Sequence, residues 1–191
     1  MILAGSQSYG INLHPDHLVR RNANDCLRAS SGGTPVKPPF EFKVMRVREC
    51  AAANCLIDTP QSSYEYWTSN IPQACWFDPA KEAFVVLVLN SRRRIIGHNL
   101  VALGSLDTIT VHPREVFRPA IVAAGSAIIL MHNHPSGDPT PSEADTRVTR
   151  DLLRAGQLLK IEVLDHVIVG QRIQPESRPY VSMRELGYCA V

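Results

Sequence analysis

A short apolar run at residues 127–131 leads directly into residues 132–145, which read HNHPSGDPTPSEAD. An apolar run of this length that ends at a turn is typical of a buried strand, and the Pro- and Gly-rich segment reverses the chain. Ser142 followed by Asp145 matches the Ser-x-x-acid pattern that begins many helices. The sequence therefore predicts a buried strand, a turn and a helix in succession, with polar side chains where the strand ends.

Three of these polar side chains have the types and the spacing of metal ligands. Side chains at i and i+2 of an extended chain project from the same face, so His132 and His134 can bind one ion. Asp145, in the first turn of the next helix, completes a facial set. Three protein ligands with a fourth position left open are typical of a catalytic zinc site. Capping alone also explains Ser142 and Asp145, and the two roles are compatible.

Two other polar features lie near these residues. Asp138 is closer in sequence to the histidines, but it lies in a Gly-Asp-Pro turn, where Asp is common for backbone reasons. We therefore interpret it as a turn residue. Asp165 and His166 form a polar pair inside an apolar stretch, and we expect either a contact that orients a ligand histidine or a satisfied structural pair.

We predict three regions along the chain. Residues 1–39 show no sustained periodicity and include the linker-like segment 30–39, so we expect them to be poorly ordered. Residues 40–75 form an N-terminal extension with an alternating strand at 40–48 and a short helix at 64–70, entered through 59–63. Residues 76–191 form the main domain, with a core that begins near Trp76.

The main domain alternates predicted strands with predicted helices, which indicates the α/β class. Its two helices have apolar stripes: we expect Val116, Phe117, Ala120, Ile121 and Ala124 in the helix that His112 opens, and Val148, Leu152, Ala155 and Leu159 in the helix at 142–159. The expected strands are residues 82–90, 94–103, 127–131, 161–170 and 180–183, with a turn at 91–94 that makes the first two a hairpin.

Composition and charge narrow the classes of function. The 191 residues can form one domain with a sizeable core, and a net charge of +2 argues neither for nor against nucleic acid. No apolar run approaches the ~20 residues of a membrane span, and the first residues lack signal-peptide features. The five cysteines are irregularly spaced and form no CxxC pair. We therefore expect a reduced, cytoplasmic protein with buried or inert thiols.

Several blocks of the chain resemble one known family. The segment 132–145 is similar to the metal motif of the JAB/MPN (JAMM) metallopeptidase-like domains and, more narrowly, to that of their RadC-like branch. Residues 110–117 (TVHPREVF), 164–170 (LDHVIVG) and 180–187 (YVSMRELG) resemble further blocks of that branch. The resemblance covers roughly residues 60–187. It implies a single MPN-type, cytidine-deaminase-like domain with a mixed β-sheet packed with helices.

The resemblance also implies a chemistry for the motif. One Zn²⁺ per chain, held by His132, His134 and Asp145, lowers the pKa of a bound water toward ~7. The general base of JAMM domains is a glutamate from an earlier strand, and Glu82 matches it. Glu115 is the rival acid, although a helix start favours an acid in any case. Ser142 is the candidate oxyanion donor, a role that competes with helix capping.

These expectations favour a zinc-dependent metallopeptidase-like hydrolase acting on a peptide, amide or isopeptide bond. One alternative is a DNA-repair or DNA-associated accessory protein, since that label is attached to RadC-like proteins. The chain shows no helix-hairpin-helix-like Gly-rich segment before the core, which weakens this alternative. A catalytically silent MPN scaffold is the other alternative, although the complete ligand set argues against it. The sequence predicts no particular substrate and no oligomeric state.

Overall fold

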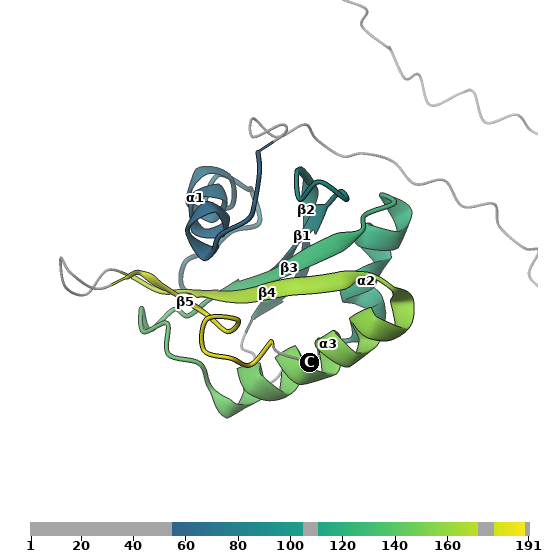
Figure 1. The fold of residues 1–191 in the computed structure, drawn as a ribbon. Coiled ribbons are helices and arrows are strands. Elements are labelled where there is room, and N and C mark those ends of the chain that lie inside the picture. The colour runs from purple at the N-terminus through teal and green to yellow at the C-terminus, as the bar shows by residue number, and fades with distance from the viewer. Residues whose placement is uncertain (1–54, 105–110, 172–177, 190–191) are drawn as a thin grey trace, which may run out of the picture. The chain divides into compact units, whose positions relative to one another are not determined.

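The computed structural model describes residues 55–104, 111–171 and 178–189 of the chain. In these residues five strands form one mixed sheet in the order β2-β1-β3-β4-β5, packed with three helices (Figure 1). This arrangement confirms the predicted fold class. The elements are α1 (Pro60–Asn70), β1 (Glu82–Leu89), β2 (Ile95–Gly104), α2 (Pro113–Val122), β3 (Ala127–Asn133), α3 (Glu143–Leu159), β4 (Glu162–Val169) and β5 (Tyr180–Ser182).

The topology places the strand that carries the histidines at the centre of the sheet. β3 pairs antiparallel with β1 on one side and parallel with β4 on the other. A parallel pair needs a crossover connection, and α3 supplies it between β3 and β4. β2 and β5 complete the sheet as antiparallel neighbours of β1 and β4. The residues at the end of β3 therefore emerge between β1 and β4, where helix α3 begins.

The sheet is covered on both faces. α1 lies on one face, and α2 and α3 lie on the other (Figure 1). Alternate residues of β1 point to the two sides: Val85 and Leu87 pack with α1, whereas Phe84 and Val86 pack with α2 and α3. A strand that is buried on both faces shows a continuous apolar run instead of alternation. This explains why the apolar run at 127–131 predicted a buried strand.

The core begins earlier in the chain than we predicted from the sequence. Thr59 caps α1 and forms a capping box with Ser62, which confirms the predicted helix entry. Tyr66, Trp67 and Ile71 are buried against the sheet, whereas the prediction placed the start of the core near Trp76. α1 is only weakly amphipathic, since three buried aromatic or apolar side chains lie among many polar ones, so its buried face is hard to recognise.

The buried face of α2 is narrower than predicted. Val116, Phe117 and Ala120 are buried as expected, but Ile121 is 58% exposed. Ala124 lies beyond the end of the helix in the left-handed region, with φ of 52°. The buried stripe of α2 therefore ends at Ala120, one turn before the end of the predicted stripe at Ala124.

The buried face of α3 is rotated from the predicted one. Leu152 is buried as predicted, but Leu159 is 45% exposed, and Val148 and Ala155 are only partly buried. The face that meets the sheet instead carries Asp145, Thr149, Leu153 and Gly156 together with Leu152. Two polar residues in this face are invisible to a search for apolar periodicity. The rotation is required by the contacts that Asp145 and Thr149 make, described below.

Several predictions fall on residues outside the described ranges. These are the poorly ordered segment 1–39 and the strand at 40–48. In the described ranges, no helix is long and apolar enough to cross a membrane.

The described thiols are free but not all buried, because Cys55 and Cys75 are exposed. Burial raises the pKa of Cys189 to about 11, which makes that thiol a poor nucleophile.

Gly156 provides a test of the packing between α3 and β4. In an exposed helix interior, Gly→Ala stabilises by about 0.5–1 kcal/mol. Here a Cβ would meet the carbonyl oxygen of Ile161 at 2.6 Å and a methyl group of Val163 at 3.0 Å. We expect Gly156→Ala to lower the free energy of unfolding by about 1–3 kcal/mol, measured by urea denaturation. Gly97→Ala, where nothing lies within 4 Å of the added atom, is the control and should not destabilise. A Gly156→Ala protein as stable as wild type would contradict this packing.

Candidate metal centre

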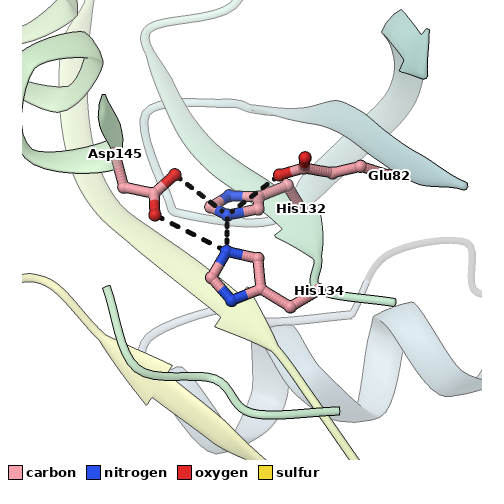
Figure 2. Close-up of side chains that lie close together, drawn as sticks. All are labelled: Glu82, His132, His134 and Asp145. Atoms are coloured by element: carbon pink, nitrogen blue, oxygen red, sulfur yellow. Dashed lines mark hydrogen bonds and ion pairs between the residues drawn. The ribbon is translucent and has the colours of Figure 1, made fainter. Parts of the chain in front are cut away.

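Four side chains converge where β1, β3 and α3 meet (Figure 2). Glu82 is the first residue of β1, His132 lies near the end of β3, His134 follows β3 directly, and Asp145 lies in the first turn of α3. One ligand atom from each residue lies within 4.8 Å of the others. The structure therefore brings together the three predicted metal ligands and the predicted general base.

The distances show that the four side chains surround one point and do not form separate pairs. The Nε2 atoms of His132 and His134 are 3.0 Å apart. His132 Nε2 lies 3.1 Å from Asp145 Oδ1 and 3.5 Å from Glu82 Oε1, and His134 Nε2 lies 3.5 Å from Asp145 Oδ2. Two imidazole nitrogens and a carboxylate at these separations can be ligands of a single ion.

His132 is held inside the sheet. It pairs with Phe84 of β1 and Ile168 of β4, and its side chain is completely buried. Its ring lies almost parallel to the ring of Phe84, with 8° between the planes and 6.0 Å between the centroids. Both neighbouring strands therefore restrict the orientation of this histidine.

His134 is held by a loop that is anchored to the end of β4. Its backbone N–H donates to the Val169 carbonyl at 2.9 Å, and the Gln171 N–H donates to the Gly137 carbonyl at 2.8 Å. Gly170 permits this contact, since a Cβ there would meet the Gly137 oxygen at 2.4 Å. Nδ1 of His134 lies 2.7 Å from the Asp138 carbonyl, which can only accept. Nδ1 therefore carries the hydrogen, and the Nε2 lone pair points into the group.

Asp145 is positioned by the cap of α3. Its Oδ2 accepts from the N–H of Ser142 at 2.7 Å and from the hydroxyl of Ser142 at 2.6 Å, and its own N–H donates to Ser142 Oγ at 3.1 Å. Its Oδ1 is buried and makes no hydrogen bond with any residue in the described ranges. A buried carboxylate oxygen with no donor is costly, whereas a cation beside it removes that cost. This oxygen has the surroundings of a metal ligand.

The electrostatics of the group favour an ionised Asp145 beside a neutral His132. Burial opposes ionisation of Asp145, but the contacts with His132 and His134 hold the pKa of its carboxyl far below the usual range. Burial lowers the pKa of His132. The contact with Asp145 raises the pKa of His134, which is partly exposed. Neutral imidazole nitrogens with one carboxylate form a donor set that suits zinc.

The remaining predicted residues lie at the edge of the group or outside it. Ser142 is an exposed N-cap, so its capping role is confirmed, whereas its catalytic role stays a prediction. Glu115, the rival acid, forms an exposed ion pair with Arg118 at 2.6 Å and is not part of the group. The Asp138 carboxylate accepts from Thr140, as expected for a turn residue.

Asp165 and His166 take one each of the two roles that the sequence left open: His166 contacts a candidate ligand, and Asp165 makes structural hydrogen bonds. Nε2 of His166 lies 2.8 Å from Nδ1 of His132, so His166 contacts a candidate ligand. Burial holds the pKa of His166 well below its usual value. Asp165 instead accepts from the hydroxyl of Ser182 at 2.6 Å and from the N–H of Arg184 at 3.0 Å, which joins β4 to the chain after β5.

Sequence analysis missed one residue that positions Glu82. Asn133, between the two histidines, accepts from the Ala83 N–H at 2.9 Å and donates to the Lys81 carbonyl at 3.0 Å. These two bonds hold the backbone on both sides of Glu82. An Asn between two candidate ligands on a buried strand is the only sequence signal of this role, because its partners lie about 50 residues away.

Comparison with known proteins identifies relatives along most of the chain. A family model described as "RadC-like JAB domain" matches residues 57–188. A UPF0758 protein of Chlorobium chlorochromatii is 44% identical over 183 residues, which cover 90% of this chain and 80% of that protein. One from Caldanaerobacter subterraneus is 51% identical over 109 residues, covering 57% of this chain and 44% of the relative. One from Chlorobaculum parvum is 46% identical over 125 residues, covering 65% and 54%.

The chain thus spans about half the length of several relatives that it matches. The region that the family model matches includes residues 132–145, in which three of the four converging side chains lie.

Metal uptake should stabilise the protein through Asp145. A ligand at 100 times its Kd raises the free energy of unfolding by about 2.7 kcal/mol. We expect added zinc to raise the melting temperature of the wild type and to leave that of Asp145→Ala unchanged, measured by differential scanning fluorimetry. Asp151→Ala, an exposed acid on the same helix, is the control and should respond like the wild type. An equal response in Asp145→Ala would exclude this residue as a ligand.

Proposed function

This chain belongs to the RadC-like JAB domain family, and on that basis we propose that it is a zinc-dependent hydrolase of peptide, amide or isopeptide bonds. The observation that carries the proposal is the convergence of His132 Nε2, His134 Nε2 and Asp145 Oδ1 beside the carboxylate of Glu82. Three protein donors leave a further position for water and substrate, which is the composition of a catalytic zinc site.

The donor set of this chain fits the metal that the proposal requires. His132, His134 and Asp145 would hold it, and the buried Asp145 Oδ1 supports the fit because it makes no hydrogen bond within the described ranges. When bound, zinc supplies a Lewis acid that acidifies water and polarises a carbonyl group. The remaining chemistry belongs to side chains of the protein.

Glu82 is the proposed general base. Its side chain is 11% exposed, and Oε1 lies 3.5 Å from His132 Nε2, so the carboxylate borders the metal position. It would accept a proton from the attacking water and deliver it to the amide nitrogen as the C–N bond breaks. Asn133 holds the backbone beside Glu82 and so keeps the carboxylate in place.

Ser142 is the proposed donor to the oxygen of the tetrahedral intermediate. Its hydroxyl now donates to Asp145 Oδ2, but the Ser142 N–H donates to the same oxygen. The hydroxyl can therefore turn toward substrate without leaving that oxygen unsatisfied. Such a donor is worth about 10²–10³ in kcat at other oxyanion sites.

His134 is the most exposed of the four side chains of the proposed site. His132 and Asp145 are fully buried, whereas the side chain of His134 is 17% exposed. A substrate would therefore approach past His134, on the side where the 134–138 loop meets the end of β4.

Glu82→Gln separates metal binding from turnover. The substitution keeps the size of the side chain but removes its basicity. We expect about one zinc per chain in both wild type and variant, and a loss of about 10²–10⁴ in hydrolysis by the variant. Metal content would be measured by elemental analysis, and hydrolysis by mass spectrometry of a peptide library incubated with each protein.

Glu115→Gln is the matched control, since Glu115 is an exposed glutamate outside the group. It should retain both metal and hydrolysis. A zinc-loaded wild type that cleaves no more of the library than Glu82→Gln would contradict the hydrolase and favour the silent scaffold. A folded wild type that takes up no zinc on titration would reject the metal site itself.

A further inference from the structure

We propose that Thr149 and His166 are positioning residues that keep His132 in the tautomer whose Nε2 lone pair faces the metal. The proposal rests on the metal site described above and goes beyond its ligands and base. It follows from a chain of buried hydrogen bonds in which each donor can be assigned, starting from a backbone carbonyl.

The first link is the hydroxyl of Thr149. It lies 2.6 Å from the carbonyl oxygen of Asp145, one turn earlier in α3, and that oxygen can only accept. The single hydroxyl hydrogen is therefore used on the carbonyl. Nδ1 of His166 lies 2.6 Å from the same Thr149 oxygen. Because the hydroxyl hydrogen is already used, Nδ1 of His166 must carry a hydrogen and donate it to Thr149.

The second link is the contact between the two histidines. His166 is completely buried, and an uncompensated positive charge on its ring would be costly there, so the ring is neutral. A neutral imidazole has one N–H, which leaves Nε2 of His166 as an acceptor. Nδ1 of His132, at 2.8 Å, must donate to it. Nε2 of His132 is then left without a hydrogen, and this atom faces His134 and Asp145.

The chain of bonds begins and ends on one residue. The backbone carbonyl of Asp145 anchors Thr149, and the carboxylate of Asp145 meets the histidine that Thr149 and His166 orient. Phe84 restricts both rings, lying parallel to His132 and edge-on to His166 with centroids 5.5 Å apart. Histidine ligands of metals commonly donate their other N–H to a fixed partner, and losing that partner costs 10–100-fold in metal affinity.

The test removes one hydroxyl and keeps the shape of the side chain. We expect Thr149→Val to weaken zinc binding about 10–100-fold, measured by competition with a chromophoric chelator, and Thr149→Ser to restore it. Thr146→Val is the matched control: the Thr146 hydroxyl makes the same kind of bond, to the carbonyl of Ser142 four residues earlier, but it makes no hydrogen bond to a histidine of the described segments. Its zinc affinity should equal that of the wild type.

A second readout needs no metal. Imidazole ¹⁵N shifts in the zinc-free protein should show the hydrogen of His132 on Nδ1 in wild type, Thr149→Ser and Thr146→Val, and a mixture of tautomers in Thr149→Val. A wild-type hydrogen on Nε2, or a Thr149→Val protein with wild-type shifts and zinc affinity, would overturn the proposal. Wild type that binds zinc but hydrolyses nothing would reject the proposed hydrolase and leave this inference standing.

A separate observation bears on the substrate of the proposed hydrolase. A cavity of about 200 Å³ adjoins His134, between α1 and the ends of β3 and β4. Tyr64, Trp67, Phe77 and Val169 line it, and none of its described lining residues is Asp, Glu, Lys or Arg. We infer that it binds a large apolar side chain of the substrate, at a residue near the bond that is cleaved.

Size and position both support this occupant. Cavities that hold whole drug-sized molecules measure about 300–1,000 Å³, so this one is better matched to a single side chain. His134 belongs both to the metal centre and to the cavity wall, so an extended peptide can place one residue in the cavity while an adjacent amide reaches the metal. Burying a Phe side chain is worth about 1.5–3 kcal/mol, which corresponds to a preference of roughly 10- to 150-fold.

The test uses zinc-loaded Glu82→Gln, so that binding is measured without cleavage. Peptides that differ at one position, with Phe, Gly or Asp, would be titrated by calorimetry at each position along a library consensus. We expect Phe to bind at least about 10-fold more tightly than Asp at one position. Adding Thr68→Trp, at the cavity wall on α1, should remove that preference, whereas Ser69→Trp on the neighbouring exposed residue should not.

A Phe preference that survives Thr68→Trp, or no preference at any position in peptides that bind, would overturn the assignment of the cavity. If no peptide binds the variant although it holds zinc, the inference about the cavity and the peptide substrate fails together, while the metal site stands.

Discussion

The rest of the site depends on one buried carboxylate at the start of α3. Asp145 uses Oδ2 to close the cap with Ser142, Oδ1 to face His132, and its backbone carbonyl to hold Thr149. A shift of Asp145 would therefore disturb the start of α3, one ligand position of the candidate metal site, and the hydrogen bonds through Thr149 and His166 that orient His132. The rotation of α3 follows from the same constraint, because its inward face must present Asp145 and Thr149 rather than the widest apolar stripe.

Sequence alone could indicate the three candidate ligands because their spacing is local. His132 lies near the end of a strand, His134 follows two residues later, and Asp145 lies in the first turn of the next helix. Local spacing and capping patterns were therefore sufficient. Glu82 is 50 residues from His132, and only the resemblance to JAMM domains indicated it. The proposed positioning residues could not be found in the sequence, because their contacts with histidines join residues far apart along the chain and Thr149 looks like any other threonine in a helix.

The same distinction explains the fold predictions. β1 and β3 were predictable because strands buried on both faces are continuous apolar runs. α1 was underestimated because its own pattern is mostly polar and its partners lie far along the chain, as in the hydrogen bond between Gln61 and Tyr180, which are 119 residues apart. At α2, the apolar pattern continued in the sequence to Ala124, although the helix ends at Val122, so Ala124 was wrongly placed in the core; Ile121 lies within the helix but on its exposed side. Patterns thus predict which elements exist better than they predict which side each element buries.

The buried residues of the candidate metal site tolerate less change than the exposed ones. His132 and Asp145 are enclosed by β1, β4 and α3, so any change there must preserve the geometry of the candidate metal site and the core together. His134 instead belongs to a loop held to β4 by backbone bonds and by the close approach of Gly170 to Gly137. Such a loop can keep the position of its histidine while the side chains around it change. Differences in substrate among chains with this core should therefore arise on the His134 side, from α1 and the segments near Gln171, rather than in the ligand set.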